Sequence, residues 1–300
     1  MRSETNARLP IGLFDLGRRI RRIALDGPSL TPNSTKVVDP VTARGATKSI
    51  NAGDGHCERR HRNGNGRLPG PAGNGMNYEV LIADDHALYR AALTGAVASA
   101  CSNVQFLGAE SIDDLFDALE QHPDTDLLLL DLNLPGAHGF CALAHLRGSR
   151  PQLPVILVSA SADQRTMRQA LAFGAQGFVA KSADAGTIGR NVSSVLRGED
   201  VSPAGLGASA APAADPAALE FAEALAELTT QQYRVFGLLI LGRGDAQIAR
   251  ELKITEAAVK AQVAATLRKL SAADRLDAAR LADRLWADTL QIRLPREKIE

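Results

Sequence analysis

The sequence is poor in cysteine and in long apolar runs. Its 300 residues include only three cysteines, Cys57, Cys101 and Cys141, which lie far apart and follow no metal-ligand spacing. This excludes a disulfide framework and a four-ligand zinc site, and it indicates a reducing compartment. No apolar run approaches the roughly 18 residues that a membrane-spanning helix requires. We therefore expect a cytoplasmic protein that does not associate with membranes.

The chain also lacks net charge, because 34 basic residues balance 34 acidic ones. The basic and acidic residues are unevenly distributed along the sequence. Residues 1–75 contain 13 basic and 6 acidic side chains, residues 76–220 contain 8 and 17, and residues 221–300 contain 13 and 11. A basic start, an acidic middle and a mildly basic end indicate three regions with different tasks.

Residues 1–76 show no sustained apolar periodicity and are rich in Gly, Asn, Arg and Pro. Such a composition buries too little apolar surface to offset the entropy of the chain. We therefore predict a disordered basic extension over residues 1–76. Because the first apolar run begins soon after Met76, a second hypothesis is that translation starts at Met76.

From Tyr78 onward, short apolar runs alternate with segments of helical spacing. The runs are Val80–Ala83, Val104–Leu107, Leu127–Leu130, Val155–Val158 and Gly177–Ala180. The helical segments are Ala87–Ser99, Ile112–Gln121, Gly139–Arg147, Gln164–Phe173 and Ala185–Leu196. Strands that are buried on both faces appear as continuous apolar runs. The pattern predicts an α/β fold with a doubly wound, five-stranded parallel sheet over residues 77–198.

The remainder of the chain carries no strand signal. Residues 199–223 are small, Ala-rich and Pro-containing, which indicates a linker. Residues 224–290 are predicted to be all helical and 291–300 to be a tail. The first expected helix runs from a cap at Thr229 or Thr230 to about Leu241, and the second has a cap at Asp245 and covers Ala246–Leu252. The third covers Ala257–Leu270 after Thr255 and Glu256, and the fourth covers Ala272–Trp286. The second and third helices form a helix-turn-helix pattern, although a generic small helical bundle has the same periodicity.

Acidic residues follow two of the predicted strands. Asp84 and Asp85 come directly after the first strand, and Asp131 comes directly after the third. The carboxyl ends of parallel strands meet at one edge of the sheet. At the same edge, the fourth run ends at Ser159 and Lys181 follows the fifth. A single aspartate at a strand end is usually a helix cap or a solvated terminus, so the prediction depends on the whole set.

Crowded carboxylates need a cation, and hard oxygen ligands suit Mg²⁺. A carboxylate nucleophile, a divalent metal, a hydroxyl group and a lysine together can accept a phosphoryl group as an aspartyl phosphate.

The same segments resemble the receiver domains of NarL/FixJ-family two-component response regulators. The resemblance lies in Ile82–Arg90 (IADDHALYR), Leu130–Gly136 (LDLNLPG) and Gly177–Ser182 (GFVAKS), and it covers about Asn77 to Arg197. It implies that Asp131 takes the phosphoryl group from a sensor histidine kinase. By the same resemblance, Asp85, Asp131 and the Asn133 carbonyl bind Mg²⁺ directly, and Asp84 binds it through water. Lys181 and Ser159 contact the phosphoryl oxygens, and Phe178 acts as an aromatic switch. Without the resemblance, Phe178 reads as a core ring in a strand.

The helical region resembles the LuxR-type helix-turn-helix over about sixty residues. The matching positions are Leu228 and Thr229, Ile248–Leu252, Thr255, Val259 and Lys260, and Leu267–Leu270. The resemblance implies that residues 257–270 enter the major groove of double-stranded DNA and that the last helix forms a homodimer when the protein is phosphorylated. The implied DNA-binding residues are Thr255, Ala258, Lys260, Ala261, Gln262, Arg268 and Lys269.

Several residues depart from the LuxR-type pattern. Gln262 stands where histidine is frequent, Ala261, Ala264 and Ala265 leave few polar groups, and Arg234 stands where an acidic residue is common. Such a helix has few side chains to read base edges, so it would rely on few contacts or on DNA shape. An alternative is that the helical domain binds a protein instead of DNA.

A phosphatase that uses Asp131 as its nucleophile is a further alternative. This class needs a second acid two positions on, where the chain has Asn133. We therefore expect no turnover of an external substrate. His86, His122, His138 and His145 show no metal-ligand spacing and are predicted to be surface or second-shell residues.

Overall fold

The computed structural model describes residues 77–199, 201 and 215–285. The predicted extension over 1–76, most of the predicted linker and the tail over 291–300 lie outside these residues.

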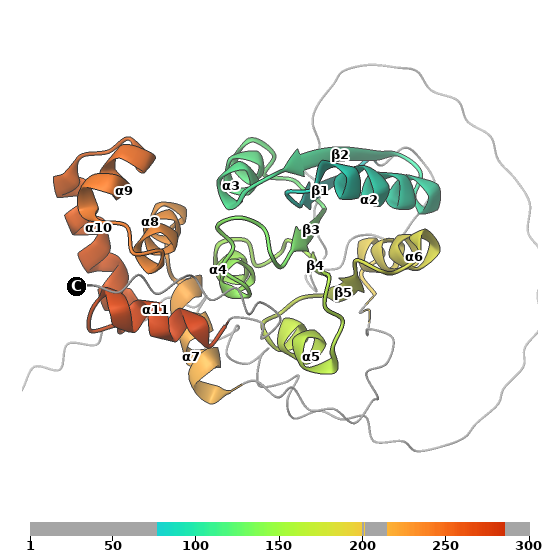
Figure 1. The fold of residues 1–300 in the computed structure, drawn as a ribbon. Helices are drawn as coiled ribbons and strands as arrows, with labels where there is room; N and C mark the ends of the chain where they lie inside the picture. Colours follow the sequence, from blue (N-terminus) through green and yellow to red (C-terminus); the bar gives the residue numbers. More distant parts are fainter. Residues whose placement is uncertain (1–76, 200, 202–214, 286–300) are drawn as a thin grey trace, which may run out of the picture. The chain divides into compact units, whose positions relative to one another are not determined.

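Five parallel strands form a single sheet in the order β2-β1-β3-β4-β5 (Figure 1). The strands are β1 (Tyr78–Ala83), β2 (Val104–Ala109), β3 (Leu127–Asp131), β4 (Val155–Ser159) and β5 (Gly177–Ala180). The helices between and after them are α2 (Ala87–Ala100), α3 (Ile112–Gln121), α4 (Cys141–Ser149), α5 (Gln164–Ala172) and α6 (Ala185–Leu196). The predicted doubly wound α/β fold is confirmed.

One of these helices begins later than the sequence predicts. The helix expected from Gly139 starts at Cys141, because His138 and Gly139 both have positive φ, 53° and 65°. Left-handed residues cannot continue a right-handed helix, so they delay its start.

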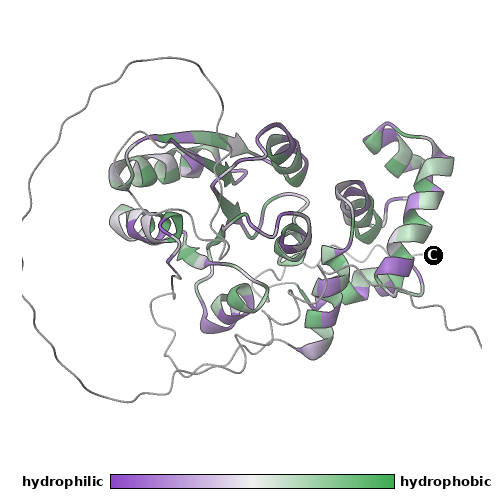
Figure 2. Ribbon diagram, turned by 180° about the vertical axis from the view of Figure 1, so that it is seen from behind, coloured by the Kyte–Doolittle hydropathy of each residue, from purple (hydrophilic) through white to green (hydrophobic). Residues whose placement is uncertain are grey.

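The central strands consist largely of hydrophobic residues, which are green in the ribbon of Figure 2, and apolar side chains pack on both faces of the sheet. On one face, strand residues such as Leu81 and Leu130 pack with α3, α4 and α5. On the other face, strand residues such as Ile82 and Leu129 pack with α2 and α6. Successive residues of a strand point to opposite faces, and this two-sided burial explains why the strands appear in the sequence as unbroken apolar runs.

The second part of the described chain is entirely helical. Its helices are α7 (Pro216–Ala226), α8 (Thr230–Ile240), α9 (Asp245–Leu252), α10 (Glu256–Lys269) and α11 (Arg275–Asp283). Thr229, one of the two predicted caps, caps α8. Thr255 caps α10, which starts at Glu256, one residue earlier than predicted, and the residue before α9 is Gly244 instead of Asp245. The last helix is shorter than predicted, since Asp274 caps it and it ends at Asp283. None of the helices described is long and apolar enough to cross a membrane.

Helix α7 begins inside the stretch that the sequence suggested was a linker. Asp215 accepts a hydrogen bond from the backbone of Ala217, and Pro216 occupies the first turn, where a missing N–H costs nothing. Phe221 and Leu225 are buried on one face of the helix. The small residues and the proline indicated a linker, but the apolar residues recur at helical spacing, and the segment folds as a helix.

The helical part has its own small core, which includes Val235, Ile248 and Val259. A second apolar cluster contains residues of α7 and α8 together with residues of α3 and α4. The described residues belong to one compact unit, so the sheet domain and the helices are packed against one another.

Candidate functional site

The pairing of β1 with β3 brings two aspartates together at the edge of the sheet. Ala83 is paired with Leu130 in a parallel register, so Asp84 and Asp131 follow at neighbouring positions. Both carboxylates are almost fully buried, with 1% of each residue exposed. Asp85, the next residue, is exposed. Two buried carboxylates at such a short spacing require a positively charged partner.

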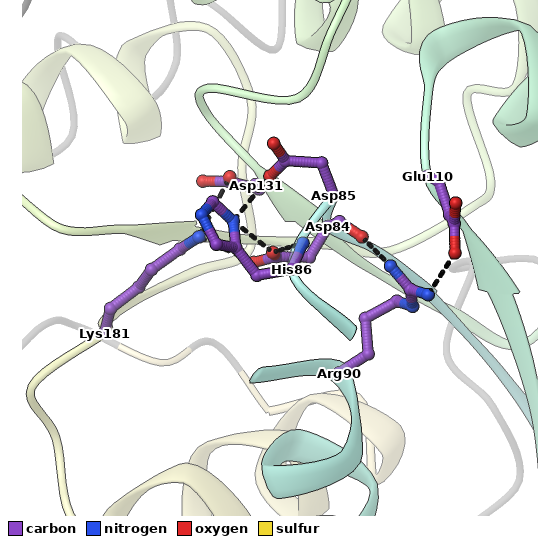
Figure 3. A network of polar contacts seen from close by, with 7 residues as sticks. All are labelled: Asp84, Asp85, His86, Arg90, Glu110, Asp131 and Lys181. Atoms are coloured by element: carbon purple, nitrogen blue, oxygen red, sulfur yellow. Dashed lines mark hydrogen bonds and ion pairs between the residues drawn. The ribbon is translucent and has the colours of Figure 1, made fainter. Parts of the chain in front are cut away.

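Lys181 supplies that positive charge (Figure 3). Its Nζ atom lies 2.7 Å from Asp84 Oδ2 and 2.9 Å from Asp131 Oδ2. Its backbone N–H donates a 2.7 Å hydrogen bond to the Ser159 carbonyl, which fixes Lys181 to the end of β4. Burial raises the pKa of Asp131, and the neighbouring Lys181 ammonium only partly opposes this. Burial disfavours the charge on Lys181, but its bonds to Asp84 and Asp131 outweigh this and raise its pKa.

Two further residues belong to the same network and were not predicted to do so. Arg90 donates a 2.6 Å hydrogen bond to the Asp84 carbonyl and forms an ion pair with Glu110. His86 Nδ1 lies 2.6 Å from Asp85 Oδ1 and 3.3 Å from Asp84 Oδ1. His86 is exposed, as expected of a surface histidine, and its position directly after two aspartates is the signal in the sequence for its place in this network.

The residues present suit a divalent cation. Ligand atoms of Asp84, Asp85 and His86 all lie within 4.8 Å of one another. Asp131 Oδ1 is buried and accepts no hydrogen bond of acceptable geometry from the described residues. An oxygen-rich set with such an unsatisfied carboxylate oxygen fits Mg²⁺. Asp84, Asp85 and Asp131 supply the carboxylate oxygens that could hold such an ion.

Ser159 and Phe178, the two residues with an implied switch role, lie in different parts of the receiver domain. Ser159 ends β4, is buried, and its hydroxyl accepts a 3.2 Å hydrogen bond from the Ser161 backbone. Phe178 pairs with Leu157 across β4 and β5, and its ring is buried in the core with α3, α4 and α5. In this conformation Ser159 is at the acidic edge of the sheet and Phe178 is a core residue.

The predicted DNA-binding residues lie on or beside α10, the second helix of a helix-turn-helix. Lys253, in the left-handed conformation, ends α9, and the turn leads through Ile254 to Thr255. The exposed members of the predicted set are Thr255, Lys260, Ala261 and Arg268, while Ala258 and Gln262 are half-buried. Val259 and Val263 point into the core and fix which face of α10 is free.

Lys269 differs from the other predicted DNA-binding residues. Its Nζ atom donates to the Glu227 carbonyl and to Gln232 Oε1, both at 2.8 Å. The side chain therefore ties the end of α10 to the start of α8. The sequence could not show this, because the partners are about forty residues away.

His138 and His145 are buried, so the expectation that they lie on the surface was wrong. His138 is 7% exposed and His145 is completely buried. Burial lowers the pKa of each ring to about 4, and for His145 the Leu225 carbonyl opposes this only in part. Both rings therefore stay neutral when they are buried at neutral pH.

Comparison with known proteins gives matches to two families. Residues 80–193 match the response regulator receiver domain, and residues 226–282 match the bacterial regulatory proteins of the luxR family. The chain is 35% identical over 205 residues to the glycerol metabolism activator of Pseudomonas putida, covering 67% of this chain and 93% of that protein. It is 28% identical over 200 residues to the nitrate/nitrite response regulator protein NarL of Escherichia coli K12, covering 67% and 92%.

Solved structures give weaker similarity over the full chain. A LuxR family DNA-binding response regulator from Silicibacter pomeroyi is 35% identical and covers 43% of this chain and 99% of its own, with a TM-score of 0.38.

Proposed function

The chain belongs to the response regulators that join a receiver domain to a LuxR-family DNA-binding domain, and we propose that phosphorylation of Asp131 controls its binding to specific DNA sequences. That it is a transcriptional response regulator follows from its two domains. The observation that supports the finer proposal is the position of Lys181 between the buried carboxylates of Asp84 and Asp131. This arrangement already pairs the proposed phosphoacceptor with a cation.

The proposed reaction is an in-line transfer to Asp131. A carboxylate oxygen of Asp131 forms a bond to phosphorus while the bond from phosphorus to the imidazole nitrogen of a sensor histidine kinase breaks. The leaving imidazole keeps the electron pair and then takes up a proton. Mg²⁺ held by Asp85, Asp131 and the Asn133 carbonyl, with Asp84 acting through water, would supply positive charge for the phosphoryl oxygens. Lys181 orients Asp131 and donates a hydrogen bond to one phosphoryl oxygen.

Phosphorylation would change the partners of the nearby side chains. An aspartyl phosphate carries up to two negative charges and strong acceptor oxygens, so it attracts Lys181 more strongly than a carboxylate does. The Ser159 hydroxyl would turn to donate to a second phosphoryl oxygen, and Phe178 would respond as an aromatic switch. Such differential contacts shift the population of two conformations of the receiver domain.

We expect α10 to enter the major groove of double-stranded DNA. The exposed face of α10 carries Lys260 and Arg268, whose charges suit phosphate contacts, while Ala261 is small enough for close approach to bases. The proposed partners are a sensor histidine kinase, DNA and a second copy of the chain in a phosphorylated homodimer. Asp131 would accept a phosphoryl group on the protein itself, with no turnover of an external substrate.

The test compares the Asp131→Asn variant with Asp124→Asn, which changes an exposed aspartate elsewhere in the receiver domain. Incubation with acetyl phosphate and Mg²⁺ should add one base-labile phosphoryl group to the wild type and to Asp124→Asn, but none to Asp131→Asn. Gel shifts with genomic fragments should then show phosphorylation-strengthened binding for the first two proteins. Phosphorylation without binding to any fragment would favour the alternative in which the helical domain binds a protein.

A further inference from the structure

His86 lies on the exposed side of the acidic site. It is the residue before α2, its backbone is extended, and its side chain makes no capping hydrogen bond. Its backbone N–H donates a 2.8 Å hydrogen bond to Asp84 Oδ1, which fixes the position of His86 beside the carboxylates. The side chain is 68% exposed. A ring that is neither packed in the core nor used as a helix cap is available to bind a solute.

The His86 imidazole lies against the carboxylates of the two aspartates before it, as Figure 3 shows. Its Nδ1 atom lies 2.6 Å from Asp85 Oδ1 and 3.3 Å from Asp84 Oδ1. Two ligand atoms at adjacent corners of an octahedral ion lie about 3 Å apart, since each is about 2.1 Å from the metal. The two distances from Nδ1 fall on either side of that value. These side chains therefore already have nearly the separations of ligands to one ion.

Asp131 adds a donor atom from another strand. The residue is 1% exposed, and its Oδ1 atom accepts no hydrogen bond of acceptable geometry from the residues that the structure describes. Its other carboxylate oxygen is held by Lys181, which also holds Asp84. A buried carboxylate oxygen without a partner is costly. In Figure 3 the Asp131 carboxylate lies next to that of Asp85, so an ion bound there would satisfy it.

The charges of this group match one divalent cation. Asp84, Asp85 and Asp131 carry three negative charges and Lys181 carries one positive charge, which leaves a net charge of two negative charges. The neighbouring Arg90 does not change this balance, because it forms an ion pair with Glu110. Buried charges are stabilised by compensating charge, and a single divalent ion supplies it.

The imidazole nitrogen of His86 determines which divalent ions suit the site best. Mg²⁺ takes oxygen ligands and keeps several of its waters. First-row divalent transition ions accept imidazole nitrogen as well as carboxylate oxygen, and histidine is a frequent ligand for them. A transition ion would therefore gain a bond to His86 in place of a water, whereas Mg²⁺ would not.

We propose that His86 is a further ligand of this cation site and that the site therefore prefers a first-row divalent transition ion, such as Mn²⁺, to Mg²⁺. Mg²⁺ can still occupy the carboxylate oxygens, with water in place of the imidazole. The inference rests on the cation site of the proposed function, but it does not depend on phosphorylation of Asp131. In the competing arrangement the imidazole only donates a hydrogen bond to Asp85 and contacts no metal.

The test uses Mn²⁺ and compares His86→Gln with His122→Gln in the full-length protein. His122 is a matched control, because its Nδ1 atom lies 3.1 Å from Glu79 Oε2, near the start of β1 and at the opposite end of that strand from Asp84. Residues 1–76 also contain histidine and cysteine, so Asp131→Asn is included to identify the signals that come from this site. Circular dichroism checks that each variant is folded.

The electron paramagnetic resonance signal of free Mn²⁺ measures its affinity, and competition with Mg²⁺ measures the preference. The ratio of Mn²⁺ affinity to Mg²⁺ affinity should fall by at least about tenfold in His86→Gln, because groups at a metal site usually contribute that much. The ratio should stay at the wild-type value in His122→Gln, and Asp131→Asn should weaken the binding of both ions. An unchanged ratio in folded His86→Gln would overturn the proposal, as would Mn²⁺ binding that does not depend on Asp131.

Electron spin echo envelope modulation of the bound Mn²⁺ detects a directly coordinated nitrogen atom. Nitrogen modulation should be present in the wild type and in His122→Gln and absent in His86→Gln. Mn²⁺ that binds through Asp131 but shows no nitrogen modulation would contradict ligation by His86. These measurements contain no acetyl phosphate. Nitrogen ligation in a protein that acetyl phosphate fails to modify would refute the proposed phosphorylation and support the metal assignment.

Discussion

Lys181 and Asp131, which are 50 residues apart in the chain, are joined by a 2.9 Å hydrogen bond at the edge of the sheet. The same ammonium group lies 2.7 Å from Asp84. One cation thus compensates two buried carboxylates, and the energetic consequences of that arrangement can be measured.

Replacing Lys181 with methionine should destabilise the receiver domain in the absence of Mg²⁺. Two buried carboxylates would lose their positive partner, which costs about 3 kcal/mol of unfolding free energy. Mg²⁺ should recover much of this loss, and EDTA should remove the recovery. Urea denaturation with and without Mg²⁺ measures both effects, and Lys253→Met, at an exposed position, is the control. A Lys181→Met protein as stable as the control without metal would show that the ion pairs contribute little.

Stability should decrease in mild acid because of the two buried histidines. Burial lowers the pKa of both His138 and His145 to about 4, so the native state keeps them neutral while the unfolded chain protonates near its ordinary pKa of 6.5. The unfolded state then binds more protons, and stability falls as the pH drops from about 6.5 toward 4, by about 3 kcal/mol for each ring.

The pH dependence of the unfolding free energy should therefore flatten in His145→Gln, and flatten further when His138→Gln is added. Thermal denaturation between pH 7 and pH 4.5 measures the slope. Identical slopes for wild type and the double variant would show that neither ring is buried in solution.

Lys260→Ala should weaken DNA binding about equally across sequences. Lys260 is exposed on α10, and a lost phosphate contact reduces the slope of log affinity against log salt by about one. Gel shifts at several salt concentrations measure this slope. Arg190→Ala, an exposed change in the receiver domain, should leave it unaltered. An unchanged slope in Lys260→Ala would mean that α10 does not face DNA phosphates.

Thr255→Ala should destabilise the start of the recognition helix by about 1 kcal/mol, because the Thr255 hydroxyl accepts the hydrogen bond of the Ala258 backbone at 3.1 Å. Thr255→Ser keeps the hydroxyl and should stay near wild type. Hydrogen exchange of the first-turn amides of α10 separates the two variants. Equal exchange in both would show that the cap contributes nothing.

The sheet domain could be predicted almost residue by residue, because each signal is local. Burial on both faces makes Leu127–Leu130 a continuous apolar run, and the parallel topology then places Asp84, Asp131 and Lys181 at one edge. The predicted start of α4 is wrong because Gly139 has a left-handed backbone conformation. The predicted end of the linker is wrong because the composition before α7 suggested a loop while its apolar residues have helical spacing. The caps at Thr229 and Thr255 were predictable since a side-chain oxygen at a helix start acts within three residues.

The sequence by itself determined the strands, the helices and the set of acidic residues, since these depend on apolar periodicity and on residues that act on their neighbours. Only the tertiary structure decided that Lys181 bridges two aspartates, that Lys269 is tied to α8, and that His145 of α4 stacks on Tyr233 of α8. Contacts between residues that are tens of positions apart follow from how surfaces pack, and a single sequence carries no local signal for such packing.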